Sequence, residues 1–154
     1  MQHTKWAGLF VYTLAIVLVP GNGGCNSARG GNPAYGKEDQ RAYDNMATLK
    51  TVEEFEKYVE QASRPVLVDF YATWCPPCKW LAPVIGSLAR EYGDRVDFYR
   101  IDTDKAEDLA RAMNIRSIPT VFIYVNGEPI HNSRGAAPRE TYATALDEAL
   151  RESQ

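Results

Sequence analysis

The sequence predicts an α/β fold, in which helices cover both faces of a central mixed β-sheet. Two near-continuous apolar runs, at 66–71 and 120–125, are rich in β-branched and aromatic residues. Such runs are typical of strands that are buried on both faces. Segments with apolar residues at helical spacing alternate with the strands, which is the pattern of α/β architectures. The predicted order is βαβαβαββα, with right-handed parallel crossovers.

The first elements follow from local signals. A short strand is predicted at 47–49. Thr51 and Glu54 form a capping box, in which each side chain can satisfy an orphan backbone donor, so a helix is expected to begin there. Pro65 closes that helix. The run at 66–71 then predicts a central strand.

The second half of the domain continues the alternation. A turn leads into a long helix from about Cys75 to Tyr92. Further elements are predicted as a strand at 96–101, a helix at 106–113, strands at 120–125 and 128–132, and a helix from 138 or 139 to 151. Asn126-Gly127 is a hairpin turn signal, so the last two strands are expected to pair antiparallel.

Size and charge argue against several classes of protein. The chain has 154 residues, which predicts one domain. It has 17 Lys and Arg against 20 Asp and Glu, a net charge of −3. No basic surplus exists to neutralise a phosphate backbone, so no nucleic-acid partner is expected. Its three cysteines are too few for a miniprotein stapled by disulfides.

The N-terminus has the pattern of a targeting segment. Residues 6–19 form a charge-free, mostly apolar run, and Lys5 precedes it. A positive residue followed by about 7–15 apolar residues is typical of a secretory signal. A membrane-spanning helix usually needs about 17–25 apolar residues, so a permanent anchor is the less favoured alternative. We therefore expect an exported, periplasmic protein with a signal peptide at 1–24.

Cys25 is a candidate lipidation site. Small residues precede it just after the apolar run, which resembles a bacterial lipoprotein cleavage site. The pattern departs at Asn22, where an aliphatic residue is usual. The alternative is an ordinary free cysteine in a linker, with a soluble protein after signal cleavage. The segment 25–45 is predicted to be a flexible, glycine-rich linker, and 46–154 to be the folded domain.

The chemistry of the domain is predicted to lie in a CxxC motif. Cys75 follows a buried strand and opens a helix, where free N–H groups and the helix dipole stabilise a thiolate. Cys78 lies one turn further on, near enough to close a disulfide. Structural zinc normally needs four Cys or His ligands, and a c-type haem site needs CxxCH, whose last place Lys79 occupies. The motif therefore indicates redox chemistry, with no metal site.

Together with its surroundings, this motif resembles the thioredoxin family. The resemblance rests on PVLVDFYATWCPPCKWLAP, then RSIPT, then NGE, and Gly135 before the last helix. It implies the thioredoxin fold over nearly all of 46–154. It also implies a redox-active Cys75–Cys78 disulfide, with Cys75 as the attacking and Cys78 as the resolving cysteine.

The resemblance also assigns roles around the cysteines. Asp69 matches the family's buried aspartate; its neighbours are apolar, so its pKa should be raised, and it can take the Cys78 proton. The alternative for Asp69 is a surface carboxylate on a sheet edge. The resemblance implies that Pro119 is a cis-proline. Residues that it places along the substrate groove are Trp74, Ile118, Pro119, Thr120 and Gly135.

Three residues depart from the usual family pattern. The dipeptide between the cysteines is Pro-Pro instead of Gly-Pro, Tyr71 replaces a common Trp, and Arg100 replaces a Lys that often neighbours the buried aspartate. Pro-Pro also resembles membrane-tethered thioredoxins of cytochrome maturation, although those relatives usually carry an extra insertion in the middle of the fold.

We therefore expect a thiol–disulfide oxidoreductase that reduces protein disulfides and is a monomer without a cofactor. Its partners would be disulfide-containing proteins and an electron-donating thiol reductase, for which a membrane thiol transporter is the candidate. The alternatives are a reductant for cytochrome c maturation, a dithiol oxidase or isomerase, and a chaperone or scaffold whose cysteines are idle.

Overall fold

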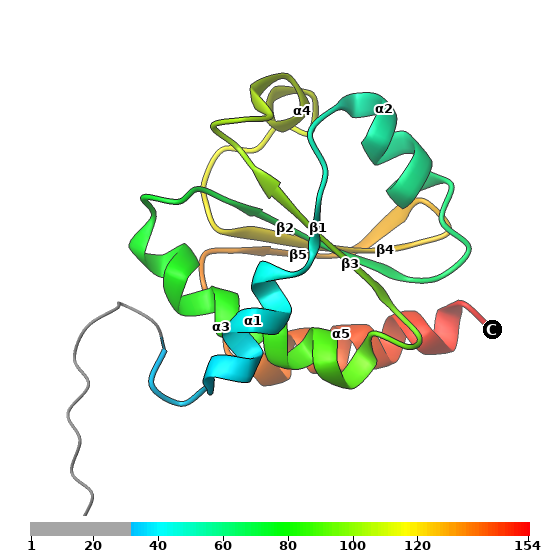
Figure 1. Ribbon diagram of the computed structural model, residues 1–154. Coiled ribbons are helices and arrows are strands. Elements are labelled where there is room, and N and C mark those ends of the chain that lie inside the picture. The colour runs from blue at the N-terminus through cyan, green and yellow to red at the C-terminus, as the bar shows by residue number, and fades with distance from the viewer. Residues whose placement is uncertain (1–31) are drawn as a thin grey trace, which may run out of the picture.

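Five strands form one mixed sheet in the computed structural model, which describes residues 32–154 (Figure 1). The strands are β1 Ala47–Thr48, β2 Val66–Tyr71, β3 Asp97–Asp102, β4 Thr120–Val125 and β5 Glu128–Arg134. Their order across the sheet is β1-β3-β2-β4-β5. Strands β1, β3 and β2 are parallel, β4 is antiparallel to β2, and β5 is antiparallel to β4. The predicted mixed sheet is confirmed.

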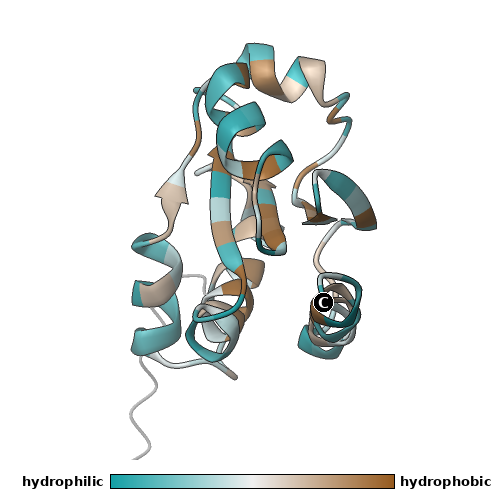
Figure 2. Ribbon diagram, turned by 90° about the vertical axis from the view of Figure 1, so that its right-hand side faces the viewer, coloured by the Kyte–Doolittle hydropathy of each residue, from teal (hydrophilic) through white to brown (hydrophobic). Residues whose placement is uncertain are grey.

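Helices lie on both faces of this sheet, as the sequence predicts. They are α1 Lys37–Asp44, α2 Val52–Phe55, the π-helical segment η1 Glu56–Glu60, α3 Pro76–Tyr92, α4 Glu107–Ala112 and α5 Arg139–Glu152. Helices α1, α3 and α5 cover one face, and α2 and α4 cover the other (Figures 1 and 2). This arrangement leaves β2 enclosed by neighbouring strands at both edges and by helices on both faces.

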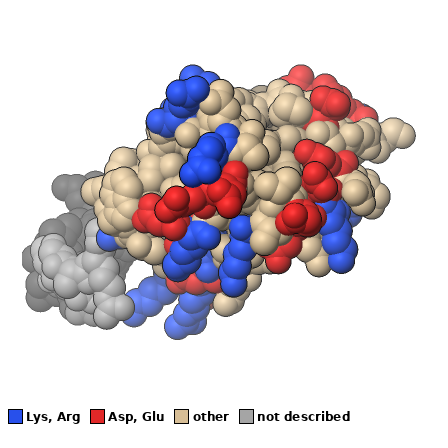
Figure 3. Space-filling view, turned by 90° about the horizontal axis from the view of Figure 1, so that it is seen from above, with Lys and Arg blue, Asp and Glu red and all other residues tan. Residues whose placement is uncertain are grey.

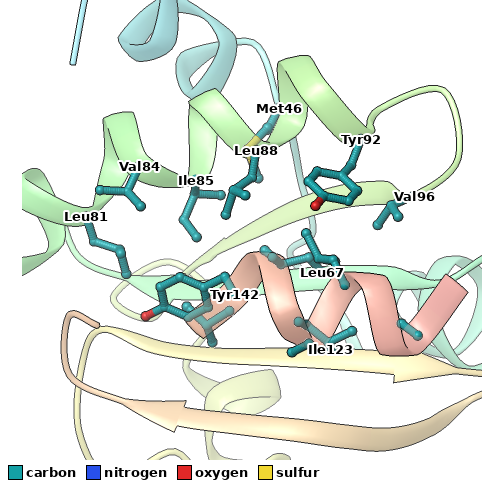
Figure 4. Close-up of a cluster of buried hydrophobic side chains, with 14 of the residues drawn as sticks. Met46, Leu67, Leu81, Val84, Ile85, Leu88, Tyr92, Val96, Ile123 and Tyr142 are labelled. Carbon is teal, nitrogen blue, oxygen red and sulfur yellow. The ribbon is translucent and has the colours of Figure 1, made fainter. Parts of the chain in front are cut away.

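Strand β2 divides the apolar core in two, because successive side chains of a strand point to opposite faces. Leu67 packs with α3 and α5 (Figure 4). Val66, Val68 and Phe70 pack in a second cluster with side chains of α2 and α4. Asp69 lies two positions after Leu67, so the two side chains point to the same face of the sheet. The carboxyl of Asp69 therefore points to the face that α1, α3 and α5 cover.

Helix α1 corrects the predicted linker. The segment 25–45 was expected to be flexible, but Lys37–Asp44 within it is helical. Tyr43 anchors this helix, because its side chain is 3% exposed and belongs to the larger core cluster. Gly86 of α3 allows close approach, since a Cβ there would overlap the backbone of α1. The folded region therefore begins upstream of Met46.

Most other boundaries agree with the expectation. The strands at 66–71 and 120–125 are confirmed residue for residue. The hairpin turn at Asn126-Gly127 is present, with φ of 52° and 81°. Strand β5 continues to Arg134, two residues beyond the predicted end at 132.

The N-terminal predictions lie outside the described residues. The signal peptide at 1–24 and Cys25 fall in the segment 1–31, so both stay predictions. Within 32–154, none of the helices has the length and apolar character that crossing a membrane requires.

Candidate active site

The two CxxC cysteines lie where β2 gives way to α3. Cys75 is the N-cap of α3, and Pro76 is its first residue, where a missing N–H costs little. Cys75 and Cys78 form a disulfide, with their Cα atoms 5.3 Å apart. The backbone N–H of Cys78 donates to Sγ of Cys75 over 3.3 Å. In the reduced protein the same donor and the helix dipole would stabilise a thiolate on Cys75.

Asp69 is a buried carboxyl on the central strand, so the alternative of an exposed carboxylate on a sheet edge is wrong. Its side chain is 0% exposed, and β2 is flanked by β3 and β4. Burial raises its pKa from 3.8 to about 6, while the hydrogen bond from Tyr43 and the charge of Arg100 oppose that rise. A carboxyl with this pKa can accept a proton near neutral pH.

Tyr43 is the direct partner of Asp69, which sequence reasoning missed. Its hydroxyl donates to Oδ2 of Asp69 over 2.7 Å. The other carboxyl oxygen, Oδ1, has no hydrogen-bond partner among the atoms of residues 32–154. The sequence does contain a signal for α1. Glu38 and Asp39 lie in its first turn and Arg41 in its last, and the helix dipole favours acidic residues at the start of a helix and basic residues at its end.

Arg100 lies opposite Asp69 in the register of β3 and β2, but its guanidinium points elsewhere. It donates to Oγ1 of Thr48 over 3.1 Å and to the carbonyl of Asp44 over 2.9 Å. It also lies over the ring of Tyr43, 5.3 Å from the centroid. Arg100 thus acts on Asp69 through its charge rather than through a hydrogen bond.

The predicted substrate groove contains Trp74 and the loop before β4. The Ile118-Pro119 peptide is cis, and Ile118 packs against the cysteine pair. The carbonyl of Pro119 accepts a hydrogen bond from the N–H of Gly135 over 2.7 Å. Trp74 is 64% exposed. A shallow hollow of about 230 Å³ lies here, lined by Trp74, Thr103, Ala110, Ile115, Arg116, Ser117 and Ile118.

Thr120 is buried, as is Pro119 beside it, whereas Trp74 is exposed. Thr120 is 3% exposed, and its hydroxyl donates to the carbonyl of Ser117 over 2.7 Å. Thr120 therefore holds the shape of the loop and does not present its side chain to a substrate.

A second, larger groove lies on the other side of the cysteines, between α1 and the start of α3. It has a volume of about 1220 Å³. Tyr43 and Cys78 both line it, together with Tyr71 and Lys79. The groove therefore gives solvent a route towards Cys78 from the side that α1 borders.

The described residues include no candidate metal cluster, and one face of the molecule carries mixed charge. Between residues 32 and 154, no three His, Cys, Asp or Glu side chains lie close enough to hold a metal ion. On the face shown in Figure 3, acidic and basic side chains are interspersed. That face offers a partner mixed charge rather than a basic stripe.

Comparison with known proteins places this geometry among thioredoxins. The thioredoxin family model matches residues 46–148. Thioredoxin 1 of Synechococcus elongatus is 40% identical over 106 residues, covering 69% of this chain and 99% of that protein. Chloroplastic thioredoxin Y of Oryza sativa is 36% identical over 105 residues, which is 68% of this chain. The chain spans only 62% of the length of that relative.

A solved structure shows the same likeness. The crystal structure of thioredoxin from Malassezia sympodialis superposes with a TM-score of 0.62 at 31% sequence identity. The superposition covers 68% of this chain and 90% of that one. Helix α1 precedes the segment that the family model matches, so Tyr43 reaches Asp69 from outside that segment.

Proposed function

The chain belongs to the thioredoxin family, and from that premise we propose that it reduces protein disulfides by dithiol–disulfide exchange. The observation that carries the proposal is the Cys75–Cys78 pair at the N-terminus of α3, together with the buried carboxyl of Asp69 on β2, the strand that leads to this helix. This arrangement supplies a nucleophile, a resolving thiol and a base. Each is needed for one step of the exchange.

The reaction begins with the reduced pair. The Cys75 thiolate attacks one sulfur of a substrate disulfide, so that a mixed disulfide forms and the other substrate sulfur leaves as a thiolate. Cys78 then loses its proton to Asp69 and attacks Sγ of Cys75. The Cys75–Cys78 bond forms, the mixed disulfide breaks, and the second substrate sulfur leaves and is protonated. Two electrons pass from the pair to the substrate.

The substrate is expected to dock where Trp74 and the cis peptide at Ile118-Pro119 flank Cys75. Trp74 offers an exposed aromatic surface, and Gly135 adds no side chain to the rim. The site is shallow, which suits a peptide segment of a protein better than a small molecule enclosed in a pocket.

Export and membrane attachment are the finer part of the proposal. The apolar run at 6–19 supports export, and Cys25 supports lipid attachment in the periplasm. A membrane thiol transporter would then re-reduce the Cys75–Cys78 pair. Mass spectrometry of the mature N-terminus tests this. A diacylated Cys25 is expected, whereas an unmodified N-terminus beyond Cys25 would contradict lipidation.

The reduction potential of the Cys75–Cys78 pair tests the direction of electron flow. Equilibration with a thiol buffer should give a value near the roughly −270 mV of thioredoxin. A value between about −180 and −120 mV would indicate an isomerase or oxidase instead. Insulin reduction by the wild type and Cys75→Ser is the companion assay. Unchanged activity in Cys75→Ser would support a scaffold with idle cysteines.

A role dedicated to cytochrome c maturation is the less favoured alternative. The named relatives are thioredoxins. Between α3 and β4 the chain forms only β3 and α4, which leaves no inserted element of the kind those maturation proteins usually carry.

A further inference from the structure

We propose that helix α1 is part of the active site, because its Tyr43 positions Asp69 and sets the pH range in which Asp69 accepts the proton of Cys78. Tyr43 is a positioning residue, since it acts through Asp69 and not on the sulfur atoms. The inference rests on the proposed function, in which Asp69 is the base of the resolution step.

Helix α1 is firmly attached to the catalytic helix. Gly86 leaves room for the backbone of α1 on α3. Arg90 of α3 forms ion pairs with Glu38 at 3.3 Å and with Asp39 at 2.7 Å. The helix precedes the segment 46–148 that the family model matches, so Tyr43 reaches the site from outside that segment.

The hydroxyl of Tyr43 is the only described group that hydrogen-bonds the Asp69 carboxyl within 32–154. Arg100 from β3 acts on Asp69 through its charge alone. The charge of Asp69 in turn contributes to the raised pKa of Tyr142 on α5. Cys78 on α3 titrates once the disulfide is reduced, and β4 places the apolar Val121 opposite Asp69.

Tyr43 is suited to be a permanent donor. Burial, followed by the charge of Asp69, raises the pKa of Tyr43 well above 10.0, so the hydroxyl keeps its proton throughout the working range. A hydrogen bond to the charged form of a carboxyl favours that form. Tyr43 therefore holds the pKa of Asp69 below the value that burial alone would produce.

The two carboxyl oxygens of Asp69 have different surroundings, which gives them different roles in the proposal. Tyr43 occupies Oδ2, while Oδ1 has no partner among the described atoms. We assign Oδ1 as the oxygen that receives the Cys78 proton. Tyr43 and Cys78 both line the groove between α1 and α3, so the proton can afterwards leave to water from that side.

Carbon-13 NMR titration of the Asp69 carboxyl in the oxidised full chain tests the proposal. Tyr43→Phe removes only the hydroxyl and should move the titration midpoint upward by roughly one pH unit. Tyr92→Phe is the matched control, because its hydroxyl also donates to a carboxylate, Oδ1 of Asp147, over 3.1 Å, away from the cysteines. The titration midpoint of Asp69 in Tyr92→Phe should equal the midpoint in the wild type.

An unshifted midpoint in Tyr43→Phe, or an equal shift in Tyr92→Phe, would overturn the proposal. Should Tyr43→Phe fail to fold, Tyr43→Met replaces it, because methionine also lacks the hydroxyl and its flexible apolar side chain keeps the site in the core cluster filled. The same upward shift is then expected, and a wild-type midpoint would again overturn the proposal.

A kinetic experiment separates positioning from a general structural defect. Reduced protein is mixed with dithiobis(nitrobenzoate), and release of the second thionitrobenzoate reports the attack of Cys78 on Cys75. In Tyr43→Phe the pH of half-maximal rate should rise as the NMR midpoint does, with the high-pH rate retained. A uniform loss at every pH would contradict the proposal. Failure of the wild type to reduce insulin would instead refute the proposed function, and the NMR comparison would still decide the effect of Tyr43.

Discussion

The indole N–H of Trp74 donates a hydrogen bond to Oδ2 of Asp104 over 2.7 Å. It joins the turn before Cys75 to the loop that follows β3. Because Trp74 is 64% exposed, packing alone does not hold its ring. Asp104 therefore orients the aromatic surface beside Cys75.

Asp104→Ala should weaken substrate binding without changing the rate of the disulfide exchange itself. Loss of one hydrogen bond is expected to raise KM for a protein disulfide about threefold and to leave kcat nearly unchanged. Insulin reduction at varied substrate concentration measures both constants. Asp108→Ala is the control, since Asp108 pairs only with an exposed Arg111. Equal KM values in the two variants would show that substrates do not use the Trp74 surface.

Asp69→Asn should stabilise the protein at neutral pH. Burial raises the pKa of Asp69 from 3.8 to about 6, so the folded state binds more protons than the unfolded state between these values. The free energy of unfolding therefore falls as pH rises through that window. The loss reaches about 3 kcal/mol above it, and the Asn variant avoids that loss.

Urea unfolding at pH 7.5 and near pH 4 measures this effect. The stabilisation should be large at pH 7.5 and nearly absent near pH 4. Asp102→Asn serves as the control, because Asp102 is also buried but accepts from Lys105 over 3.2 Å and should gain nothing. A pH-independent effect of Asp69→Asn would contradict the linkage argument.

Two glycines with nearly equal positive φ should respond differently to alanine. Gly127 and Gly135 have φ of 81° and 84°. A Cβ at Gly135 meets nothing within 4 Å, so Gly135→Ala should cost only the left-handed conformation, about 1 kcal/mol. A Cβ at Gly127 would crowd the carbonyl of Glu60, so Gly127→Ala should cost about 2–4 kcal/mol. Equal urea midpoints would contradict this difference.

Arg100→Met should destabilise the docking of α1. The guanidinium binds the carbonyl of Asp44 at the end of α1 and lies over the ring of Tyr43, and methionine replaces neither contact. The expected cost is about 1–3 kcal/mol in the free energy of unfolding. Arg111→Met removes only exposed ion pairs and should cost less than about 0.5 kcal/mol. Similar costs for both variants would show that Arg100 does not hold α1.

The bounds of the two central strands could be predicted because burial on both faces dictates their composition. A strand covered on both faces is apolar at nearly every position, so the runs at 66–71 and 120–125 have sharp ends in the sequence. Helix α1 could not be predicted in this way. Its stability depends on Tyr43 entering a core built from distant residues and on the bare backbone at Gly86, and neither contact has a local signature.

The site shows the same division. The positions of Cys75 and Asp69 follow from local context, a helix start after a buried strand and a carboxyl among apolar neighbours. The hydrogen-bond partner of the Asp69 carboxyl does not follow from local context. Tyr43 and Arg100 reach the same region from separate elements of the chain. The Asp69–Arg100 register suggests a pair, yet competing acceptors on α1 and β1 draw the guanidinium away.

Helix α1 has only eight residues, fewer than an isolated helix needs to persist in water. We therefore expect α1 to be helical only when it is docked on α3. The segment then has two states, docked and helical or undocked and unfolded. In the undocked state Tyr43 leaves Asp69, and water reaches the carboxyl. We therefore expect the proposed base, Asp69, to be governed by a local opening equilibrium, whose free energy can be far below that of global unfolding.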